Sequence, residues 1–317
     1  MLTQSIHDAR AWTADTIDDP VHWYYPLPPA CLEALKQLME DRCRLPCTVT
    51  EVTLADAIIR AGRKHLQPVL QAFESGRGFA VIDQVSIDRY SVPEAKLLYW
   101  LLGQILGIPF EQNVQGTLLY DVRDTGQDVA YGARFSVTNA ESTFHTDNSF
   151  GSSILDYVGL LCLATAKSGG RSQVASAYGV HNDLLAHYPE ELHTLYKPFH
   201  FDRRGGVLEG QAPTVEYPVF HWDGRDLTVR YLRYWIDTGH QKASRPLTAA
   251  QNRALDALDN VIAKPEMRVE FDLQPGQMFF INNRWILHNR TAFEDHPDLD
   301  RRRHYVRLWL KAKQAPS

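Results

Sequence analysis

Phe144-His145-Thr146-Asp147-Asn148, near the middle of the chain, is the stretch on which the prediction of the fold depends. If it lies on a strand, His145 and Asp147 are two residues apart and project from the same face. An imidazole beside a carboxylate supplies two of the three ligands of a site for a redox-active transition metal. A His-x-Asp tripeptide also occurs by chance, so the prediction needs a further ligand from elsewhere in the chain.

The missing ligand is expected in the stretch from Asn282 to Arg290, which reads Asn-Asn-Arg-Trp-Ile-Leu-His-Asn-Arg. His288 in this stretch follows a turn and a buried strand, where a side chain can be held rigidly at the mouth of a barrel. The chain has 13 histidines, and most are best interpreted as structural or surface residues. Two histidines and one carboxylate with open positions form the facial triad of non-haem Fe(II) oxygenases.

The last predicted strand contains a candidate anion site. Its period of two places Arg303, Tyr305, Arg307 and Trp309 on one face. Burying arginine inside a strand is costly unless it is paired with an anion, and its planar fork suits a carboxylate. A phosphate or nucleic-acid patch at residues 301–303 is the rival interpretation, which the acidic balance of the whole chain disfavours.

Gly169-Gly170-Arg171-Ser172 predicts a sharp turn followed by a strand. The hydroxyl group of Ser172 could hydrogen-bond an anion bound nearby. Taken alone, the stretch is interpreted more simply as a tight hairpin turn.

Composition excludes several classes of protein. The 317 residues include 33 Lys and Arg against 38 Asp and Glu, a net charge of −5, which gives no basic field for nucleic acid. No apolar run is long enough to span a bilayer, and residues 1–20 lack a secretory signal, so we expect a cytoplasmic protein. Cys43 and Cys47 have the spacing of half a zinc site, although reduced cysteines are the simpler interpretation.

Helical patterns dominate the first third of the chain and strands the remainder, which favours an α+β fold, mainly β. Residues 1–75 are expected to form an arm and helices packed on a core of residues 76–317, in one structural domain. Helices are expected at 54–73, 92–106 and 248–263, and strands at 78–82, 154–164, 228–232, 278–282 and 305–310. Between 199 and 239 only short alternating runs are expected.

Together these motifs resemble the TauD/TfdA-like family of Fe(II)- and 2-oxoglutarate-dependent dioxygenases. The matching pieces follow one another in the family's order over roughly residues 76–310, whereas residues 1–75 match nothing recognisable. The resemblance implies a double-stranded β-helix, a jelly-roll core related to cupins, with helices packed outside. It also implies the cofactor Fe(II), the cosubstrate 2-oxoglutarate and O2, with release of succinate and CO2.

The resemblance assigns roles to individual residues. His145, Asp147 and His288 match the iron ligands, and Arg303 matches the arginine that pairs with the distal carboxylate of 2-oxoglutarate, with Arg302 as the alternative. Ser172 stands where the family often has a threonine that touches the same carboxylate. Arg307 matches a position that meets an anionic substrate in some members and assists the cosubstrate in others. Related iron halogenases replace the carboxylate ligand with a small residue, so Asp147 argues against halogenation.

The substrate is expected to be a small acidic or zwitterionic molecule that is hydroxylated, with desaturation or cyclisation as alternatives. Candidate substrate-binding residues are Arg134, Asn148, Phe150 and Trp285, with Arg134 or Arg307 gripping an acidic group. A non-redox cupin-like metal enzyme and a ligand-binding protein on the same scaffold are the alternatives of another class. No membrane or nucleic-acid partner is expected, and a homo-oligomer is left open.

Overall fold

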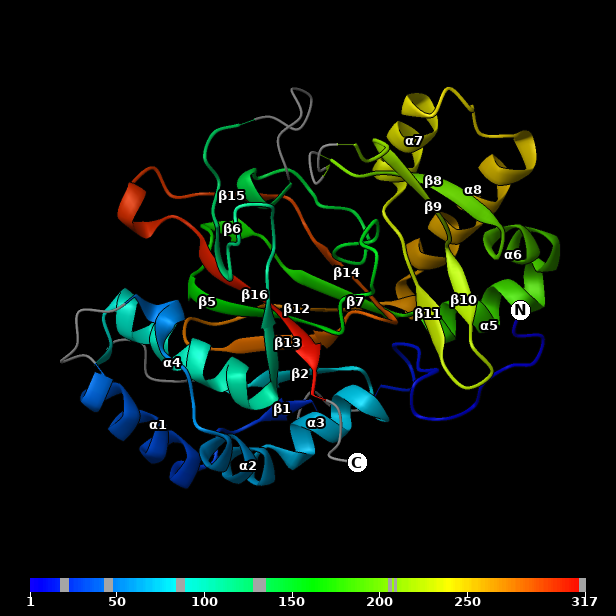
Figure 1. Cartoon of the computed structure of the whole chain (residues 1–317). Helices are drawn as coiled ribbons and strands as arrows, with labels where there is room; N and C mark the ends of the chain where they lie inside the picture. Colours follow the sequence, from blue (N-terminus) through cyan, green and yellow to red (C-terminus); the bar gives the residue numbers. More distant parts are fainter. Residues whose placement is uncertain are drawn as a thin grey trace.

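Strand β16 (His304–Ala312) is a central strand of the largest sheet, as Figure 1 shows. It pairs antiparallel with β5 (Tyr157–Ala164) on one side and with β3 (Gly107–Phe110) and β4 (Leu119–Val122) on the other. Beyond β5 the sheet continues through β13 (Met278–Asn282), β2 (Phe79–Ile82) and β1 (Tyr24–Tyr25). This computed structural model describes residues 1–17, 23–42, 48–83, 89–127, 135–204, 207 and 210–313.

A second, three-stranded sheet packs against the first. Its order is β12 (Val269–Phe271), β7 (Ser172–Ser176) and β14 (Ile286–Arg290), all antiparallel. Phe271 on β12 lies 5.2 Å, ring to ring, from Phe279 on β13, so aromatic side chains fill the space between the sheets. A short pair, β6 (Ser168–Gly169) with β15 (Phe293–Glu294), continues from the ends of this sheet.

The large sheet is covered on both faces, and its alternating side chains enter different cores. On β13, Phe279 and Ile281 belong to the core shared with the second sheet, whereas Met278 and Phe280 belong to the core under the N-terminal helices. Because every position is buried, these strands read as continuous apolar runs in the sequence.

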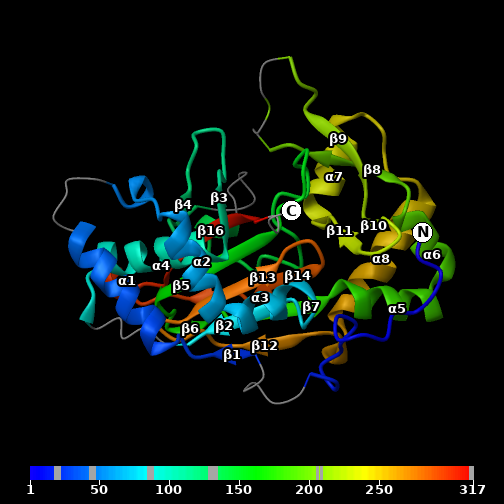
Figure 2. The ribbon, with the colours of Figure 1, turned by 60° about the horizontal axis from the view of Figure 1, so that its bottom comes forward.

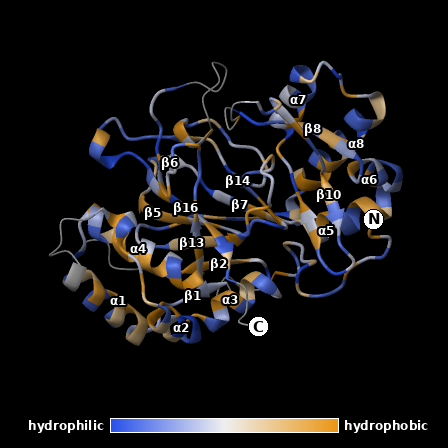
Figure 3. Ribbon diagram, viewed as in Figure 1, coloured by the Kyte–Doolittle hydropathy of each residue, from blue (hydrophilic) through white to orange (hydrophobic). Residues whose placement is uncertain are grey.

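Four helices cover the outer face of the large sheet. Apolar residues of these helices and of the sheet form one cluster, and Figure 3 colours much of α4 and of the neighbouring strands as hydrophobic. The predicted helix 54–73 is in fact two helices, because Pro68 at the start of the second cannot donate to the preceding turn. The boundary expected at residues 75 and 76 stays a prediction. The bounds are α1 (Pro29–Arg42), α2 (Asp56–His65), α3 (Gln67–Glu74) and α4 (Val92–Leu106).

A second lobe lies beside the two sheets and is visible at the right of Figures 1 and 2. It consists of four helices and two strand pairs, β8–β9 and β10–β11. Helix α7 was not predicted, because its residues have weak helical propensity and Gly239 lies within it. The bounds are α5 (Ala177–His187), α6 (Pro189–Leu195), α7 (Arg233–Lys242), α8 (Ala249–Ala263), β8 (Pro198–Asp202), β9 (Thr214–Pro218), β10 (Phe220–Trp222) and β11 (Leu227–Val229).

The remaining helical segments are single 3-10 turns. Their bounds are η2 (Val49–Glu51), η5 (Phe135–Val137), η6 (Pro265–Met267) and η7 (Leu299–Arg301). Among the described helices, none is long and apolar enough to cross a membrane. Cys43 and Cys47 lie outside the described residues, while Cys31 and Cys162 are buried free thiols.

Candidate metal centre and its two cavities

His145 and His288 face each other across a single antiparallel bridge. The backbone N–H of each residue donates to the carbonyl of the other at 3.0 Å. The strand expected at residues 144–148 is limited to this one bridge. Thr143 and Asn148 bracket the motif with φ angles of 56° and 55°, a left-handed conformation that non-glycine residues adopt mainly in turns and at functional sites.

Both imidazoles are held in forms that can bind a metal. Nδ1 of His145 lies 2.8 Å from the carbonyl oxygen of Thr143. Because a carbonyl oxygen only accepts, Nδ1 carries a proton, which leaves Nε2 as the ring nitrogen for a metal. Burial, with His145 adding to the effect, lowers the pKa of His288 to about 3. The His288 ring is therefore neutral at physiological pH, as metal binding requires.

Asp147 is buried, and its two carboxylate oxygens have different surroundings. Oδ2 accepts a 2.7 Å hydrogen bond from the indole of Trp309 and lies 3.2 Å from Nη1 of Arg307. Oδ1 faces Nε2 of His145 at 3.6 Å and accepts a 3.4 Å hydrogen bond from Nη1 of Arg307. Burial raises the pKa of Asp147, but Arg307 and His145 outweigh it and hold the pKa well below its usual range. The carboxylate is thus ionised, with one oxygen turned toward the histidines.

The backbone of Asp147 is fixed as well. Its N–H donates to Oδ1 of Asn283 at 2.8 Å, and Nδ2 of Asn283 donates to the Asp147 carbonyl at 3.0 Å. Asn283 is almost fully buried in the turn between β13 and β14. The turn before β14, the strand that carries His288, therefore also positions Asp147.

One ligand atom each from His145, Asp147 and His288 lies within 4.8 Å of the other two. Two imidazoles and one carboxylate on one side of a cavity match the donor set of a non-haem iron centre. No second cluster of three potential metal ligands is found in the part of the chain that the structure describes.

An inner cavity lies between the triad and the strands. Arg303 lies in its wall with Ser172, and Nη1 of Arg303 is buried without a hydrogen-bond partner among the described residues. Arg302 instead donates to the carbonyl of His296. Of the two candidate arginines, Arg303 is therefore the one whose side chain faces the cavity. A cationic pocket of this kind suits the carboxylate of a bound acid.

The turn Gly169-Gly170 brings the chain close to this arginine. Gly170 has a φ of 73°, and a Cβ atom there would lie 3.2 Å from Nε of Arg303. Glycine therefore serves two purposes here, the left-handed backbone conformation and the close approach to the Arg303 side chain.

Arg290 also lines the inner cavity, and the sequence analysis gave it no role. Its guanidinium donates to the carbonyls of Thr138 and Ala140, so it ties residues 138–140 to β14. Burial, with the charge of Arg303 nearby, lowers the pKa of Arg290 to about 9. The group still remains cationic at neutral pH and adds to the positive field of the cavity.

Arg307 lies where the inner cavity meets a second, outer one, and it lines both. Beyond its ion pair with Asp147, its Nε donates to Oε1 of Gln112 at 2.8 Å. Gln112 is itself fixed by hydrogen bonds to the carbonyls of Leu118 and Arg307. In this structure Arg307 therefore holds the metal-site carboxylate.

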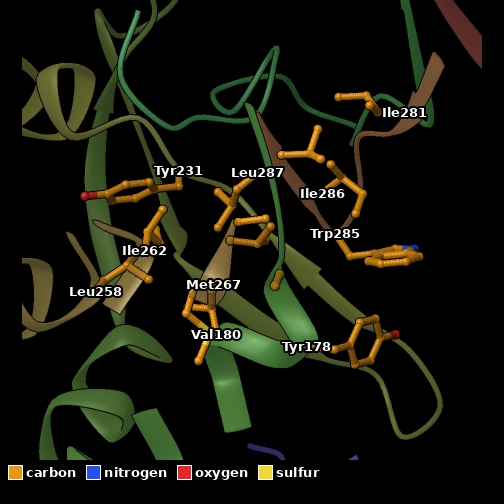
Figure 4. Packing of buried hydrophobic residues seen from close by; sticks show 14 of the residues in the cluster. Tyr178, Val180, Tyr231, Leu258, Ile262, Met267, Ile281, Trp285, Ile286 and Leu287 are labelled. Atoms are coloured by element: carbon orange, nitrogen blue, oxygen red, sulfur yellow. The ribbon is translucent and has the colours of Figure 1, made fainter. Parts of the chain in front are cut away.

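The outer cavity encloses about 740 Å³ of empty space, its open mouth included. Asn148 and Phe150 line it, as the sequence analysis expected of substrate-binding residues. Trp285 does not, because its indole packs in the hydrophobic core 5.3 Å from the ring of Tyr178, as Figure 4 shows. Arg134 lies outside the described residues.

Several lining residues of the outer cavity were not predicted. Trp309 had been placed on the same strand face as Arg303 and Arg307 but given no function. Tyr234 and Trp235 escaped notice because helix α7 itself was missed. The lining residues without an earlier role are Gln112, Phe135, Ser136, Ser142, Thr146, Arg204, Leu232, Tyr234, Trp235 and Trp309.

Residues 49–309 match the family model described as taurine catabolism dioxygenase TauD, TfdA family. The chain belongs to the TauD/TfdA family. The match begins well before residue 76, so the resemblance reaches further into the N-terminal helices than the motifs had indicated.

Similar proteins support this membership. The FR-33289 synthase of Streptomyces rubellomurinus (strain ATCC 31215) is 27% identical, over 99% of this chain and 92% of that protein. The taurine hydroxylase-like protein SAT17 of Stachybotrys chartarum (strain CBS 109288 / IBT 7711) is 29% identical over 52% of this chain and 41% of that protein.

Two solved structures share the fold. The non-heme iron oxygenase OrfP, in complex with Fe, succinate and (3S)-hydroxy-L-Arg, has a TM-score of 0.68 and 19% identity, covering 92% of this chain and 94% of that one. An asparagine oxygenase with Fe(II), 2S,3S-3-hydroxyasparagine and succinate has a TM-score of 0.65 and 19% identity, covering 91% and 93%. The predicted jelly-roll core with flanking helices is confirmed, although helices hold 35% of the residues and strands 25%.

As a TauD/TfdA-family member with an assembled His-x-Asp and His triad, the protein is an oxygenase that uses iron and 2-oxoglutarate. The prediction of enzyme class and cofactors is confirmed at this level.

Proposed function

We propose that the protein oxidises a C–H bond of a small molecule, most simply by hydroxylation, with His145, Asp147 and His288 as iron ligands. The observation that supports this most strongly is that the three ligand atoms, within 4.8 Å of one another, adjoin a cavity lined by Arg303, whose Nη1 has no hydrogen-bond partner among the described residues. One pocket thus offers both the metal ligands and a counter-charge for the acid cosubstrate.

The division of the site into two cavities supports a separate place for each of the two organic ligands. Arg303 and Ser172 hold the distal carboxylate of 2-oxoglutarate in the inner cavity, and Arg290 adds positive charge. The substrate lies in the outer cavity against Asn148 and Phe150. OrfP and the asparagine oxygenase have been solved with hydroxylated amino acids and succinate, which supports hydroxylation as the outcome.

Iron held by these three residues would supply the oxidative chemistry, in which decarboxylation of 2-oxoglutarate by O2 is coupled to oxidation of the substrate. The protein keeps the ligand set ready for it. The Thr143 carbonyl accepts from Nδ1 of His145, burial keeps His288 neutral, and Trp309 and Arg307 hold the carboxylate of Asp147. The outer aromatic wall limits water around the reacting carbon.

The test is succinate release together with iron binding. Wild-type protein with Fe(II) and 2-oxoglutarate should develop a visible charge-transfer band without oxygen, and succinate in air. Asp147→Ala should lose succinate production by at least about a thousandfold, because an iron ligand is removed. Asp15→Ala changes an exposed carboxylate remote in sequence from the triad and is the matched control.

Succinate release by Asp147→Ala at the wild-type rate would contradict the assignment of the triad. Cytoplasmic location, absence of a nucleic-acid partner and any homo-oligomer stay predictions.

A further inference from the structure

Two arginines hold the backbone on either side of the metal motif. Before it, Arg290 donates to two carbonyls of residues 138–140. After it, Nη1 of Arg230 donates to the carbonyl oxygens of Ser149 at 2.9 Å and Gly151 at 2.8 Å. Unlike Arg290, Arg230 lines neither the inner nor the outer cavity. Its contacts with the loop after the motif are therefore the feature to explain.

The guanidinium of Arg230 is itself held in place by the second lobe. The Arg230 N–H donates to the Val219 carbonyl at 2.8 Å, just after strand β11. The guanidinium lies over the ring of Tyr217 on β9, 4.0 Å from its centroid. Burial lowers the pKa of Arg230, and Arg284 adds to this effect while Tyr217 opposes it. Arginine still keeps its charge at neutral pH, so both hydrogen bonds to the loop are charge-assisted.

The two carbonyls that Arg230 binds lie on either side of Phe150. The Phe150 ring lines the outer cavity and packs on Trp235, with ring centroids 5.0 Å apart. It also lines a neighbouring hollow at the surface, so it lies where the cavity meets the outside. One donor atom thus fixes the peptide groups around a residue of the cavity wall.

The residue after Arg230 is paired with the metal motif. The N–H of Thr146, between the two ligands of the motif, donates to the Tyr231 carbonyl at 2.8 Å, and the Tyr231 N–H donates to Oγ1 of Thr146 at 3.1 Å. The chain then enters α7, which supplies Tyr234 and Trp235 to the outer cavity. The same short segment therefore sets the position of the loop, the motif and the first turn of α7 relative to one another.

The loop has little other support. Residues 149–153 belong to no helix or strand, and one turn hydrogen bond is the backbone contact within them. Beyond the part that Arg230 holds, Nζ of Lys311 on β16 donates to Oγ of Ser153 at 3.0 Å and to the Ile154 carbonyl. The conformation of the loop near the cavity therefore depends on Arg230.

We propose that Arg230 is a positioning residue for substrate oxidation: by binding the peptide groups around Phe150, it fixes the Phe150 ring in the wall of the outer cavity. The inference rests on the proposed function and adds a residue that supports the substrate side of the site. Without the guanidinium, two carbonyls lose a charged donor and the loop adopts several conformations. Substrate binding is then weakened, whereas the inner cavity keeps its strand-borne residues.

A residue that served only general stability would behave differently. Its removal would lower the stability of the second lobe and the sheets together. The effect proposed for Arg230 is local, because β5 and β13 are held by their own ladder of hydrogen bonds. The order of the Phe150 ring and the exchange of amides in the two regions distinguish these roles.

The direct test measures the order of the Phe150 ring. 4-Fluorophenylalanine is incorporated at position 150, and its fluorine resonance is recorded on protein loaded with 2-oxoglutarate and Zn(II), a diamagnetic substitute for Fe(II). We expect one narrow resonance with Arg230 present, and several or broadened resonances in Arg230→Met, because the ring then exchanges among positions. Arg230→Lys keeps a cation near the carbonyls and should restore part of the narrow resonance.

Hydrogen exchange of the anaerobic Fe(II)-loaded protein measures the same loop without a label. The Gly151 amide, which donates to the Asn148 carbonyl at 2.9 Å, should exchange at least about tenfold faster in Arg230→Met. Exchange in β5 and β13 should stay within about twofold. Arg225→Met, at an arginine of the β10–β11 hairpin whose side chain is 91% exposed, is the matched control and should behave like wild type in both measurements.

Kinetic constants show whether the effect is confined to the substrate side. The anaerobic charge-transfer band with Fe(II) and 2-oxoglutarate should form in Arg230→Met, and the KM for 2-oxoglutarate should stay within about twofold. The probe is the compound that most stimulates succinate release among the common L-amino acids and their N-acetyl derivatives, and its KM should rise by at least about tenfold. If no member of this panel stimulates release, the fluorine resonance and the exchange rate decide.

A narrow, unshifted fluorine resonance in Arg230→Met together with unchanged exchange of Gly151 would overturn the inference. Equal rises in the two KM values, or equally faster exchange in β5 and β13, would also overturn it, since they indicate a general structural role. Arg230→Gln, whose shorter side chain cannot reach both carbonyls, is the second variant if Arg230→Met does not fold. Absence of the charge-transfer band in wild-type protein would count against the proposed function, whereas the fluorine and exchange results do not depend on oxidation.

Discussion

The inner and outer cavities share the metal ligands His145 and Asp147 but are built in different ways. The inner wall is formed largely by strands, with Ser172 on β7, His288 and Arg290 on β14, and Arg303 just before β16. The outer wall draws on loops and the first turn of α7, with Arg204, Tyr234 and Trp235 from the second lobe. Hydrogen-bonded strands hold the inner groups, whereas the outer groups depend on the docking of a lobe.

This difference corresponds to two separate tasks of the site: binding of the cosubstrate and selection of the substrate. In the proposed assignment, the cosubstrate used by every turnover is bound by residues that two sheets hold rigidly. Substrate preference is assigned to loops and a short helix, which tolerate substitution without loss of the sheets. The comparison predicts that changes in the two walls affect different kinetic constants.

The largest effect is expected from Arg303→Met in the inner wall. It removes the buried cation that faces the distal carboxylate, so the KM for 2-oxoglutarate should rise by at least about a hundredfold. Arg302→Met is the matched control, because Arg302 contacts the His296 carbonyl and does not line the cavity. Equal effects of the two variants would mean that the register of this strand is misassigned.

The second prediction concerns the lobe that supports the outer wall. His181 on α5 is fully buried, with Nε2 2.9 Å from the hydroxyl of Tyr196, and burial lowers its pKa to about 4. Since the unfolded value is about 6.5, the unfolded chain binds the proton more readily between pH 6.5 and 4. The contribution of neutral His181 to the free energy of unfolding is therefore fully present above this window. It decreases as the pH falls, by about 2 kcal/mol at pH 5.

Hydrogen exchange should show this acid sensitivity in α5, α6 and β8 before it appears in β5 and β13. His181→Gln should flatten the dependence of the unfolding free energy on pH, and His193→Gln, at an exposed position on α6, should leave it unchanged. If hydrogen exchange increased at the same pH in both regions, the second lobe would not be more sensitive to acid than the sheets, and the prediction would be wrong.

The third prediction concerns Trp235 in the outer wall. Trp235→Ala removes the ring that packs on Phe150, so the KM of any compound that stimulates succinate release should rise by about tenfold. Trp235→Phe should keep most of the affinity. A comparable rise in the KM for 2-oxoglutarate would show that the two cavities do not act separately.

The smallest effect is expected from Ser172→Ala. Loss of one neutral hydroxyl donor should raise the KM for 2-oxoglutarate by about threefold to tenfold, since such a hydrogen bond contributes about 1 kcal/mol. Ser172→Thr keeps the hydroxyl and should stay near wild type. An unchanged KM in Ser172→Ala would mean that Ser172 does not contribute to binding of 2-oxoglutarate and that Arg303 binds its distal carboxylate without it.

The residues of the inner wall could be found from the sequence because local patterns determine them. A period of two along β16 placed Arg303 and Arg307 on one face, and the order of the motifs brought Ser172 and His288 to the same core. Arg290 was missed because its role depends on the carbonyls of residues 138–140, which no periodicity relates to β14.

The outer wall could not be found in this way. Helix α7 depends on ion pairs between Arg233 and α8 more than on its own propensity, so its residues gave no helical signal. Trp285, next to a metal-ligand strand in sequence, was expected at the substrate and instead fills the core. Proximity along the chain was a poor guide where the wall is assembled from distant segments.

The central place of β16 in the large sheet also affects the order of events during synthesis. β16 leaves the ribosome after every strand that it joins, and it brings Arg303, Arg307 and Trp309 with it. Until then β5 on one side and β3 and β4 on the other have open edges, and Asp147 lacks the donors that hold it. The iron site is therefore completed after translation of nearly the whole domain, and a nascent chain halted before residue 303 would present unpaired strands to chaperones.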